Sequence, residues 1–175
     1  MLINLTDVLT SDGKTEEQQV LIEMTSFSNG LEQYQIIEKS PVDLKLSNIN
    51  KGKAQIEGKA KIVLRMNCDR CLKEVDEVIK LDFFREVFAP DEIAEGTDEK
   101  SDQTFMDGYQ LNVEDLINDE ILLNLPMKVL CKEDCKGICR QCGKDLNEGD
   151  CGCDTFVPDP RMAVIKDIFN ANKEV

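Results

Sequence analysis

Apolar and polar residues alternate along residues 53–66, KAQIEGKAKIVLRM, and this period of two predicts a long strand with one buried face. A second segment of the same kind, EVDEVIKLDFF, covers residues 74–84. The residues between them, NCDRCLK, predict an antiparallel hairpin whose turn carries Cys68 and Cys71. The positions expected to be buried in the two strands are Ala54, Ile56, Ala60, Ile62, Leu64, Met66, Val75, Ile79, Leu81 and Phe83.

A helix is predicted over LNVEDLINDEILLNLP, residues 111–126, because its apolar residues recur every three or four positions. Asn112 is a suitable N-cap, and Pro126 ends the pattern. A shorter helix is expected to begin near Asp159 and Pro160. Its packing stripe would consist of Ile165, Ile168 and Phe169. Three upstream segments also have strand character: residues 19–24, 34–39 and 41–47.

This order of elements predicts an α+β fold, with an antiparallel β meander or hairpin core, a packed helix and a C-terminal cysteine-rich module. We expect a core domain over residues 1–130, interrupted by an acidic, solvated loop at about residues 90–104. The cysteine-rich module would cover residues 131–156, and a C-terminal helix and tail would cover residues 157–175.

The chain is strongly acidic, with a formal net charge of −14, while its hydrophobic content of 41% is enough for an ordinary core. Because counterion release favours basic proteins on nucleic acids, the overall charge argues against a general nucleic-acid binder. A local basic patch remains compatible with this charge.

The N-terminal segment, MLINLTDVLTSDGK, lacks the basic and apolar regions of a signal peptide. No apolar stretch approaches the roughly 20 residues of a membrane helix. We therefore expect a soluble, cytoplasmic protein that does not act at a membrane. In such a reducing compartment, the eight cysteines are not expected to form four disulfides.

The cysteines occur in closely spaced pairs, which is typical of metal sites. Cys68-x2-Cys71 and Cys139-x2-Cys142 have the spacing of zinc knuckles, in which backbone amides of a tight turn point at the thiolate sulfurs. Gly143 follows the second pair and permits the left-handed conformation of such a turn. Eight thiols are enough for two four-cysteine Zn²⁺ sites, the closed form of structural zinc. An iron–sulfur cluster is the less favoured alternative.

Two pairings of the cysteines are compatible with this spacing. The favoured one forms a first site from Cys68, Cys71, Cys131 and Cys135. Its second site is formed by Cys139, Cys142, Cys151 and Cys153. The rival pairing combines the two knuckles, Cys68 and Cys71 with Cys139 and Cys142, and leaves the other four for a second site or without metal. In the favoured pairing, the first site links distant segments and the second closes a local loop.

No catalytic arrangement is recognisable in the sequence. The chain has no histidine, no phosphate-binding glycine-rich loop and no HExxH motif. We therefore expect neither an enzyme nor a small-molecule substrate. A thiol-based redox sensor is an alternative that exposed cysteines of low pKa would permit.

Four motifs occur in a characteristic order: NCDRCL, INDEILLNLPMKVLC, CKGICRQCGKDLN and DPRMAVIKDI. Over about residues 30–170 they resemble the YceD family, bacterial and plastid proteins named for large ribosomal RNA subunit accumulation. The resemblance implies a non-enzymatic factor in ribosome biogenesis that is needed for accumulation of large-subunit (23S) ribosomal RNA. The partner would be precursor ribosomal RNA, or a basic ribosomal protein that docks on the acidic body, with an indirect effect on the RNA.

Basic residues recur near the cysteines, and three are candidates for the contact with RNA or another partner: Arg70, Lys136 and Arg140. The guanidinium group of arginine suits phosphate because it can donate two parallel hydrogen bonds. The alternative is that these cations only offset the negative charge of the thiolates.

Overall fold

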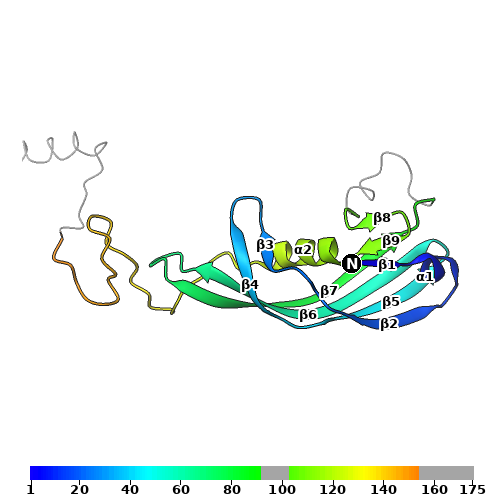
Figure 1. Ribbon diagram of the computed structural model, residues 1–175, viewed down its shortest axis with the longest axis horizontal. Coiled ribbons are helices and arrows are strands. Elements are labelled where there is room, and N and C mark those ends of the chain that lie inside the picture. Colours follow the sequence, from blue (N-terminus) through cyan, green and yellow to red (C-terminus); the bar gives the residue numbers. More distant parts are fainter. Residues whose placement is uncertain (92–102, 154–175) are drawn as a thin grey trace, which may run out of the picture. The chain divides into compact units, whose positions relative to one another are not determined.

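The computed structural model describes residues 1–91 and 103–153, and Figure 1 shows the order of the elements. The chain divides into two compact units. The first consists of Met1–Asn67 and Glu74–Val129, and the second of Cys68–Lys73 and Leu130–Val175. The turn with the first CxxC pair therefore groups with the cysteine-rich segment, whereas the sequence-based boundaries assigned it to the core domain.

The first unit is built on a six-stranded antiparallel sheet with the order β2-β5-β6-β4-β3, in which β7 also pairs with β6. Its strands are β2 (Thr15–Val20), β3 (Ser26–Ser28), β4 (Gln33–Lys39), β5 (Val42–Asn50), β6 (Lys53–Asn67) and β7 (Glu74–Phe88). The long strands β6 and β7 pair in unbroken register from Lys53↔Phe88 to Asn67↔Glu74. The hairpin and the antiparallel α+β class predicted from the sequence are both confirmed.

A smaller sheet of order β1-β9-β8 and two helices complete the first unit. These elements are β1 (Leu2–Asn4), β8 (Met106–Asp107), β9 (Gln110–Asn112), α1 (Thr6–Thr10) and α2 (Val113–Asn124). The predicted N-cap of α2 is confirmed, because the Asn112 side chain accepts a hydrogen bond of 3.2 Å from the Glu114 N–H. Among the described residues, no helix is both long and apolar enough to span a membrane.

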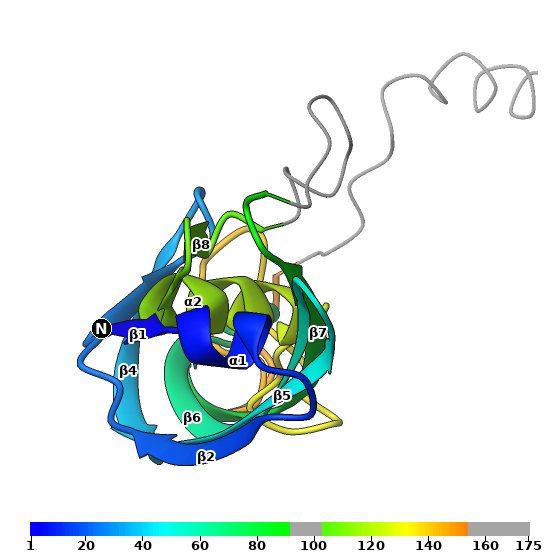
Figure 2. The ribbon, with the colours of Figure 1, turned by 90° about the vertical axis from the view of Figure 1, so that its right-hand side faces the viewer.

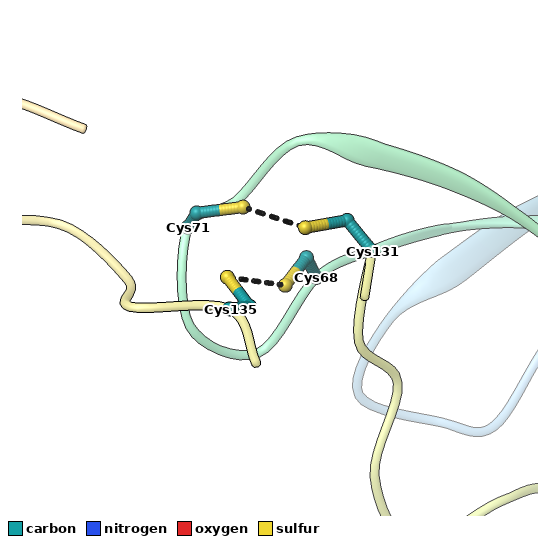
Figure 3. A group of neighbouring side chains, drawn as sticks. All are labelled: Cys68, Cys71, Cys131 and Cys135. Atoms are coloured by element: carbon teal, nitrogen blue, oxygen red, sulfur yellow. Dashed lines mark hydrogen bonds between the residues drawn. The ribbon is translucent and has the colours of Figure 1, made fainter. Parts of the chain in front are cut away.

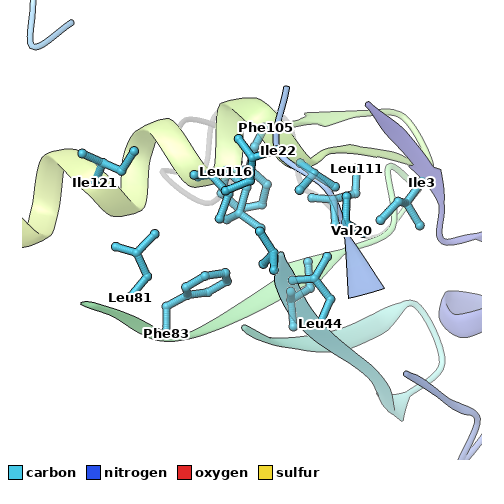
Figure 4. Close-up of a cluster of buried hydrophobic side chains, with 14 of the residues drawn as sticks. Ile3, Val20, Ile22, Leu44, Leu81, Phe83, Phe105, Leu111, Leu116 and Ile121 are labelled. Atoms are coloured by element: carbon cyan, nitrogen blue, oxygen red, sulfur yellow. The ribbon is translucent and has the colours of Figure 1, made fainter. Parts of the chain in front are cut away.

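The core of the first unit lies between the sheet and the helices, and Figure 2 shows the sheet curving around α1 and α2. The buried cluster combines side chains from the sheet, such as Leu44 and Phe83, with Leu116 and Ile121 of α2 (Figure 4). Of the ten positions expected to be buried in the hairpin, only Ala60 and Val75 are half-buried. Burial of alternate side chains therefore explains the period of two in the sequence.

One predicted strand has different bounds in the structure, and two other predicted segments cannot be compared with it. The strand expected over residues 19–24 instead covers Thr15–Val20, where TEEQQV has only Val20 buried. Such a polar strand is stabilised by its pairing with β5 and gives a weak hydrophobic signal. The C-terminal helix expected after Asp159, and residues 92–102 of the acidic loop, lie outside the described residues.

Candidate metal centres

The cysteine sulfurs gather into two groups of four in the second unit. Within each group, all the sulfurs lie within 4.8 Å of one another. The first tetrad is formed by Cys68, Cys71, Cys131 and Cys135 (Figure 3). The second tetrad is formed by Cys139, Cys142, Cys151 and Cys153. The structure thus has the first of the two pairings considered from the sequence, and every candidate metal-ligating cysteine belongs to a tetrad.

The spacing of the sulfurs in the first tetrad fits a tetrahedral ion. The Sγ atoms of Cys68 and Cys135 are 3.8 Å apart, and those of Cys71 and Cys131 are 3.5 Å apart. Four sulfurs about 2.3 Å from a central Zn²⁺ would be separated by about 3.8 Å. The four cysteines of each tetrad would therefore hold one ion and leave no open position on it.

The two CxxC turns have the same backbone hydrogen bonds. In the first, the N–H of Cys68 donates to the carbonyl of Lys73 at 2.8 Å, and the N–H of Leu72 donates to Cys68 at 2.9 Å. In the second, Cys139 donates to Lys144 at 2.8 Å, and Gly143 donates to Cys139 at 2.9 Å. This shared geometry turns the amides inside each turn toward its first sulfur, as a zinc knuckle requires.

The amides stabilise the thiolate form of the first cysteine in each turn. The backbone N–H groups of Cys142 and Gln141 lower the pKa of Cys139 to about 6. Burial alone would raise the pKa of Cys68, but the N–H groups of Cys131, Cys71 and Arg70 lower it to about 6.

The last-ionising thiol of each tetrad shows the opposite shift. Hydrogen bonding to the neighbouring thiol of Cys71, together with burial, raises the pKa of Cys131 to about 12. The neighbouring thiols of Cys142 and Cys151 raise the pKa of Cys153 to about 12. Four thiolates at this spacing repel one another, so full ionisation of either tetrad calls for a bound cation.

Residues outside the tetrads hold the first site together. The Arg70 guanidinium donates a 2.6 Å hydrogen bond to the Cys135 carbonyl, and the Arg70 carbonyl accepts one of 3.1 Å from the Ile138 N–H. The Asn147 amide nitrogen lies 3.4 Å from the Cys135 sulfur. Although burial opposes the shift, this amide and the N–H of Gly137 lower the pKa of Cys135. Donors of this kind stabilise a thiolate ligand from outside its coordination shell.

An ion pair also ties the first turn to the loop that follows the second. The Lys73 ammonium lies 2.7 Å from a carboxylate oxygen of Asp145 and 3.2 Å from one of Glu148. Lys73, helped by the N–H of Asn147, lowers the pKa of Asp145 to about 2. Asp145 is therefore a carboxylate at neutral pH and accepts from Lys73 throughout the physiological range.

The three candidate contact residues differ in their surroundings. Arg70 is exposed but uses its guanidinium within the second unit, on the carbonyl of Cys135. Lys136 and Arg140 are exposed, and the Lys136 backbone N–H donates to Asn147 at 2.9 Å. The side chains of Lys136 and Arg140 are thus the better placed of the three for a contact with a partner.

The tetrads lie within a segment that matches a known family. The family model described as "Large ribosomal RNA subunit accumulation protein YceD" matches residues 56–169, a range that contains all eight cysteines. The chain belongs to the YceD family. The resemblance stated from the four motifs is therefore confirmed.

Three curated relatives, all described as uncharacterized, come from Mycobacterium bovis and two strains of Mycobacterium tuberculosis. Each is 29% identical over 106 residues, which cover 60% of this chain and 50% of the relative. The chain thus spans about half the length of the curated relatives it matches. No solved structure matches it significantly.

The residues that support the first tetrad from the loop between Cys142 and Cys151 could not be identified from the sequence. Asp145 and Asn147 lie in GKDLNEGD, which reads as an ordinary polar loop. Lys73 is one of several basic residues near the cysteines, and nothing in its position distinguishes it from the others. The only signal was the density of charged and amide side chains close to cysteines, which does not say which thiol each one contacts.

Proposed function

We propose that this chain is a non-enzymatic, zinc-stabilised factor in ribosome biogenesis, which supports the accumulation of large-subunit (23S) ribosomal RNA in the cytoplasm. The observation that carries this proposal is the YceD family match, which spans both cysteine tetrads. The partner is precursor ribosomal RNA, or a basic ribosomal protein attracted by a chain of net charge −14.

A structural role for the metal is supported by how little else stabilises the described part of the second unit. Within its described residues after Leu130, the pairing of strands is limited to one isolated bridge, Ile138↔Asp145. The buried residues there are Cys135, Gly137 and Cys139, so an apolar core is lacking in that segment. Metal-bound cysteines supply the missing free energy in small modules of this kind.

A non-catalytic role is supported by the same ligand sets. Four thiolates occupy all the positions of a tetrahedral ion, whereas catalytic zinc keeps a position for water. Among the described residues, the groups of metal-ligating side chains close enough to share an ion are these two tetrads. The chain also has no histidine to act as a general base.

The cellular test is the amount of 23S ribosomal RNA relative to 16S in cells depleted of this protein. We expect 23S RNA to fall and to be restored by the wild-type chain. The double variant Cys131→Ser/Cys135→Ser, which lacks half of the first tetrad, should fail to restore it. Unchanged 23S RNA after complete depletion would contradict the proposed function.

The direct contact is tested with purified, zinc-loaded protein and a fragment of large-subunit RNA. The variant Lys136→Gln/Arg140→Gln removes two exposed cations without touching the contact of Arg70 with Cys135. If Lys136 and Arg140 contact RNA phosphates, the variant should bind the RNA more weakly. The slope of log affinity against log salt concentration should also shrink by about two phosphate contacts. The matched control is Lys45→Gln/Lys80→Gln, which removes two exposed cations from the first unit. Equal RNA binding by both variants would argue that Lys136 and Arg140 do not contact RNA. If the wild type binds a basic ribosomal protein but not RNA, the protein is the partner.

A further inference from the structure

Strand β7 has one edge that no other described strand pairs with. Its other edge pairs with β6. The pairing covers 15 residues without a register shift, and β7 contains no proline. Natural proteins usually avoid long, exposed edge strands. The edge strand is short, or it is interrupted by a bulge or a proline, or another segment covers it. This edge therefore has the main-chain groups of a site for strand addition.

The hydrogen bonds at the end of β7 identify which residues face that edge. The Ala89 N–H donates to the Gly52 carbonyl at 2.7 Å, so the odd-numbered residues of β7 bond to β6. The N–H groups of the even-numbered residues consequently point away from β6. In agreement, the Phe88 N–H is turned outward and donates to the Gln103 side chain at 3.1 Å. The residues with outward-facing N–H groups before Phe88 are Glu74, Asp76, Val78, Lys80, Asp82, Phe84 and Glu86.

A groove lies beside the same edge, between β7 and α2, and half of its ten lining residues are apolar while the other half are polar or charged. It has a volume of about 590 Å³, and its lining includes Phe84, Phe88, Phe105, Leu122 and Leu123. The side chains of Phe84, Leu122 and Leu123 are 53%, 51% and 66% exposed. A strand that paired with β7 would place alternate side chains toward this groove, where they could bury apolar surface.

The elements that form the groove are acidic. Strand β7 has five acidic and two basic residues, and α2 has four acidic and no basic residues, which gives a net charge of −7. One of the two cations, Arg85, is engaged with the buried Glu120 at 2.6 Å. Lysines and an arginine of β6 pair with three β7 carboxylates, but such exposed pairs are weak and screened. The electrostatic potential at the β7 edge is therefore negative and favours a basic partner.

We propose that the β7 edge binds an extended segment of a basic partner protein, which adds to the sheet as a further strand. Its apolar side chains enter the groove beside α2, and the alternating basic side chains face the acidic residues of β7. The main-chain bonds supply affinity and the alternation supplies specificity, as in other cases of strand addition. A second copy of this chain is disfavoured as the occupant, because pairing two such edges would bring together two surfaces of net charge −7.

The first test uses the full-length, zinc-loaded chain and a synthetic peptide of eight residues that alternates valine and lysine. The control peptide has glutamate in place of each lysine. We expect the lysine peptide to bind at least tenfold more tightly. Hydrogen exchange of the amides of Val78, Lys80, Asp82 and Phe84 should slow on binding, while their odd-numbered neighbours, already bonded to β6, should change little.

A pair of variants separates strand addition from general charge attraction. Lys80→Pro removes an outward-facing N–H without removing a bond to β6, and Lys80→Gln makes the same charge change but keeps the N–H. Strand addition predicts at least tenfold weaker binding for the proline variant than for the glutamine variant. Charge attraction alone predicts equal binding. Circular dichroism and zinc content show whether the proline variant is folded. If it is not, the hydrogen-exchange pattern of the wild type still tests the proposal.

Four results would overturn the proposal. Two of them are binding results: equal affinity of the wild type for the two peptides, and equal affinity of the two Lys80 variants for the lysine peptide. The other two are exchange results: slow exchange of the even-numbered β7 amides in the free protein, and protection of those amides by an RNA fragment but not by the peptide. None of these results depends on whether the protein affects 23S RNA in cells. The proposal and the proposed function can therefore fail independently.

Discussion

The side-chain amide of Asn147 lies 3.4 Å from the sulfur of Cys135, a member of the first tetrad, although Asn147 belongs to the segment that carries the second tetrad. Asn147 lies in the loop between Cys142 and Cys151, which are ligating candidates of the second tetrad. Asp145 of that loop also binds Lys73 in the turn of the first tetrad. The loop closed by the second site therefore carries residues that support the first.

The Asn147→Ala variant should weaken metal binding at the first site by about 10- to 100-fold, the effect typical of losing a group that orients a ligand. The amide would no longer donate to the Cys135 thiolate. Chelator competition measures the affinities, and amide NMR signals from the two CxxC turns, Cys68–Cys71 and Cys139–Cys142, report on each site separately. The second site is the internal control, and a loss of equal size at both sites would indicate general unfolding instead.

Removal of the second site should weaken the first. The double variant Cys151→Ser/Cys153→Ser releases one end of the loop, so Asn147 and Asp145 lose their fixed positions. We expect the wild type to bind two Zn²⁺ per chain by native mass spectrometry, and this variant to bind one, with about tenfold lower affinity. The sequence suggested that the second site closes only a local loop, and unchanged affinity at the first site would support that simpler hypothesis.

Leu72 has the same position in the first CxxC turn as Gly143 has in the second. Their φ angles are 61° and 73°, and Leu72 is the one described residue other than glycine with a positive φ. A side chain in this left-handed region costs about 1 kcal/mol. Because Leu72 is 62% exposed, Leu72→Gly removes this cost and loses little buried surface.

Leu72→Gly should therefore raise the metal affinity of the first site by up to about fivefold, which corresponds to about 1 kcal/mol. The reciprocal variant is Gly143→Leu, which should lower the affinity of the second site by a similar factor. An added Cβ at Gly143 has no heavy atom within 4 Å, so the change there acts through the backbone. Chelator competition measures both effects, and a loss of affinity in Leu72→Gly would show that the leucine side chain itself stabilises the turn.

The parts of the fold that follow from a repeating pattern could be predicted from the sequence. Burial of alternate residues defined the β6–β7 hairpin, and the N-cap and apolar period defined α2. The pairing of β1 with β9 could not be predicted, because Leu2 and Asn112 meet only through the tertiary fold. For the same reason, spacing identified the cysteines as candidate ligands but did not identify Asn147 or Leu72. Their roles depend on a hydrogen bond between distant segments and on a backbone angle, and neither leaves a pattern in the sequence.

Gly58 interrupts the apolar alternation of β6 at a position where a side chain has no room. It lies opposite Phe83 of β7, and a Cβ added there would overlap the Phe83 ring. Both residues are buried, and Phe83 belongs to the core cluster, so its ring cannot move into solvent without losing contacts. The sequence showed only that this glycine falls in the register of the buried face.

Gly58→Ala should therefore lower the free energy of unfolding by about 1–3 kcal/mol, the usual cost of overpacking a core. This loss should exceed any gain from the smaller chain entropy of alanine in the unfolded state. The measurement is urea unfolding of the zinc-loaded protein, with Phe83→Leu as the partner variant. If the overlap with the ring is the cause, Gly58→Ala should cost at least 1 kcal/mol less in the Phe83→Leu background than in the wild type. An equal cost in both backgrounds would locate the strain in the β6 backbone instead of in the contact with Phe83.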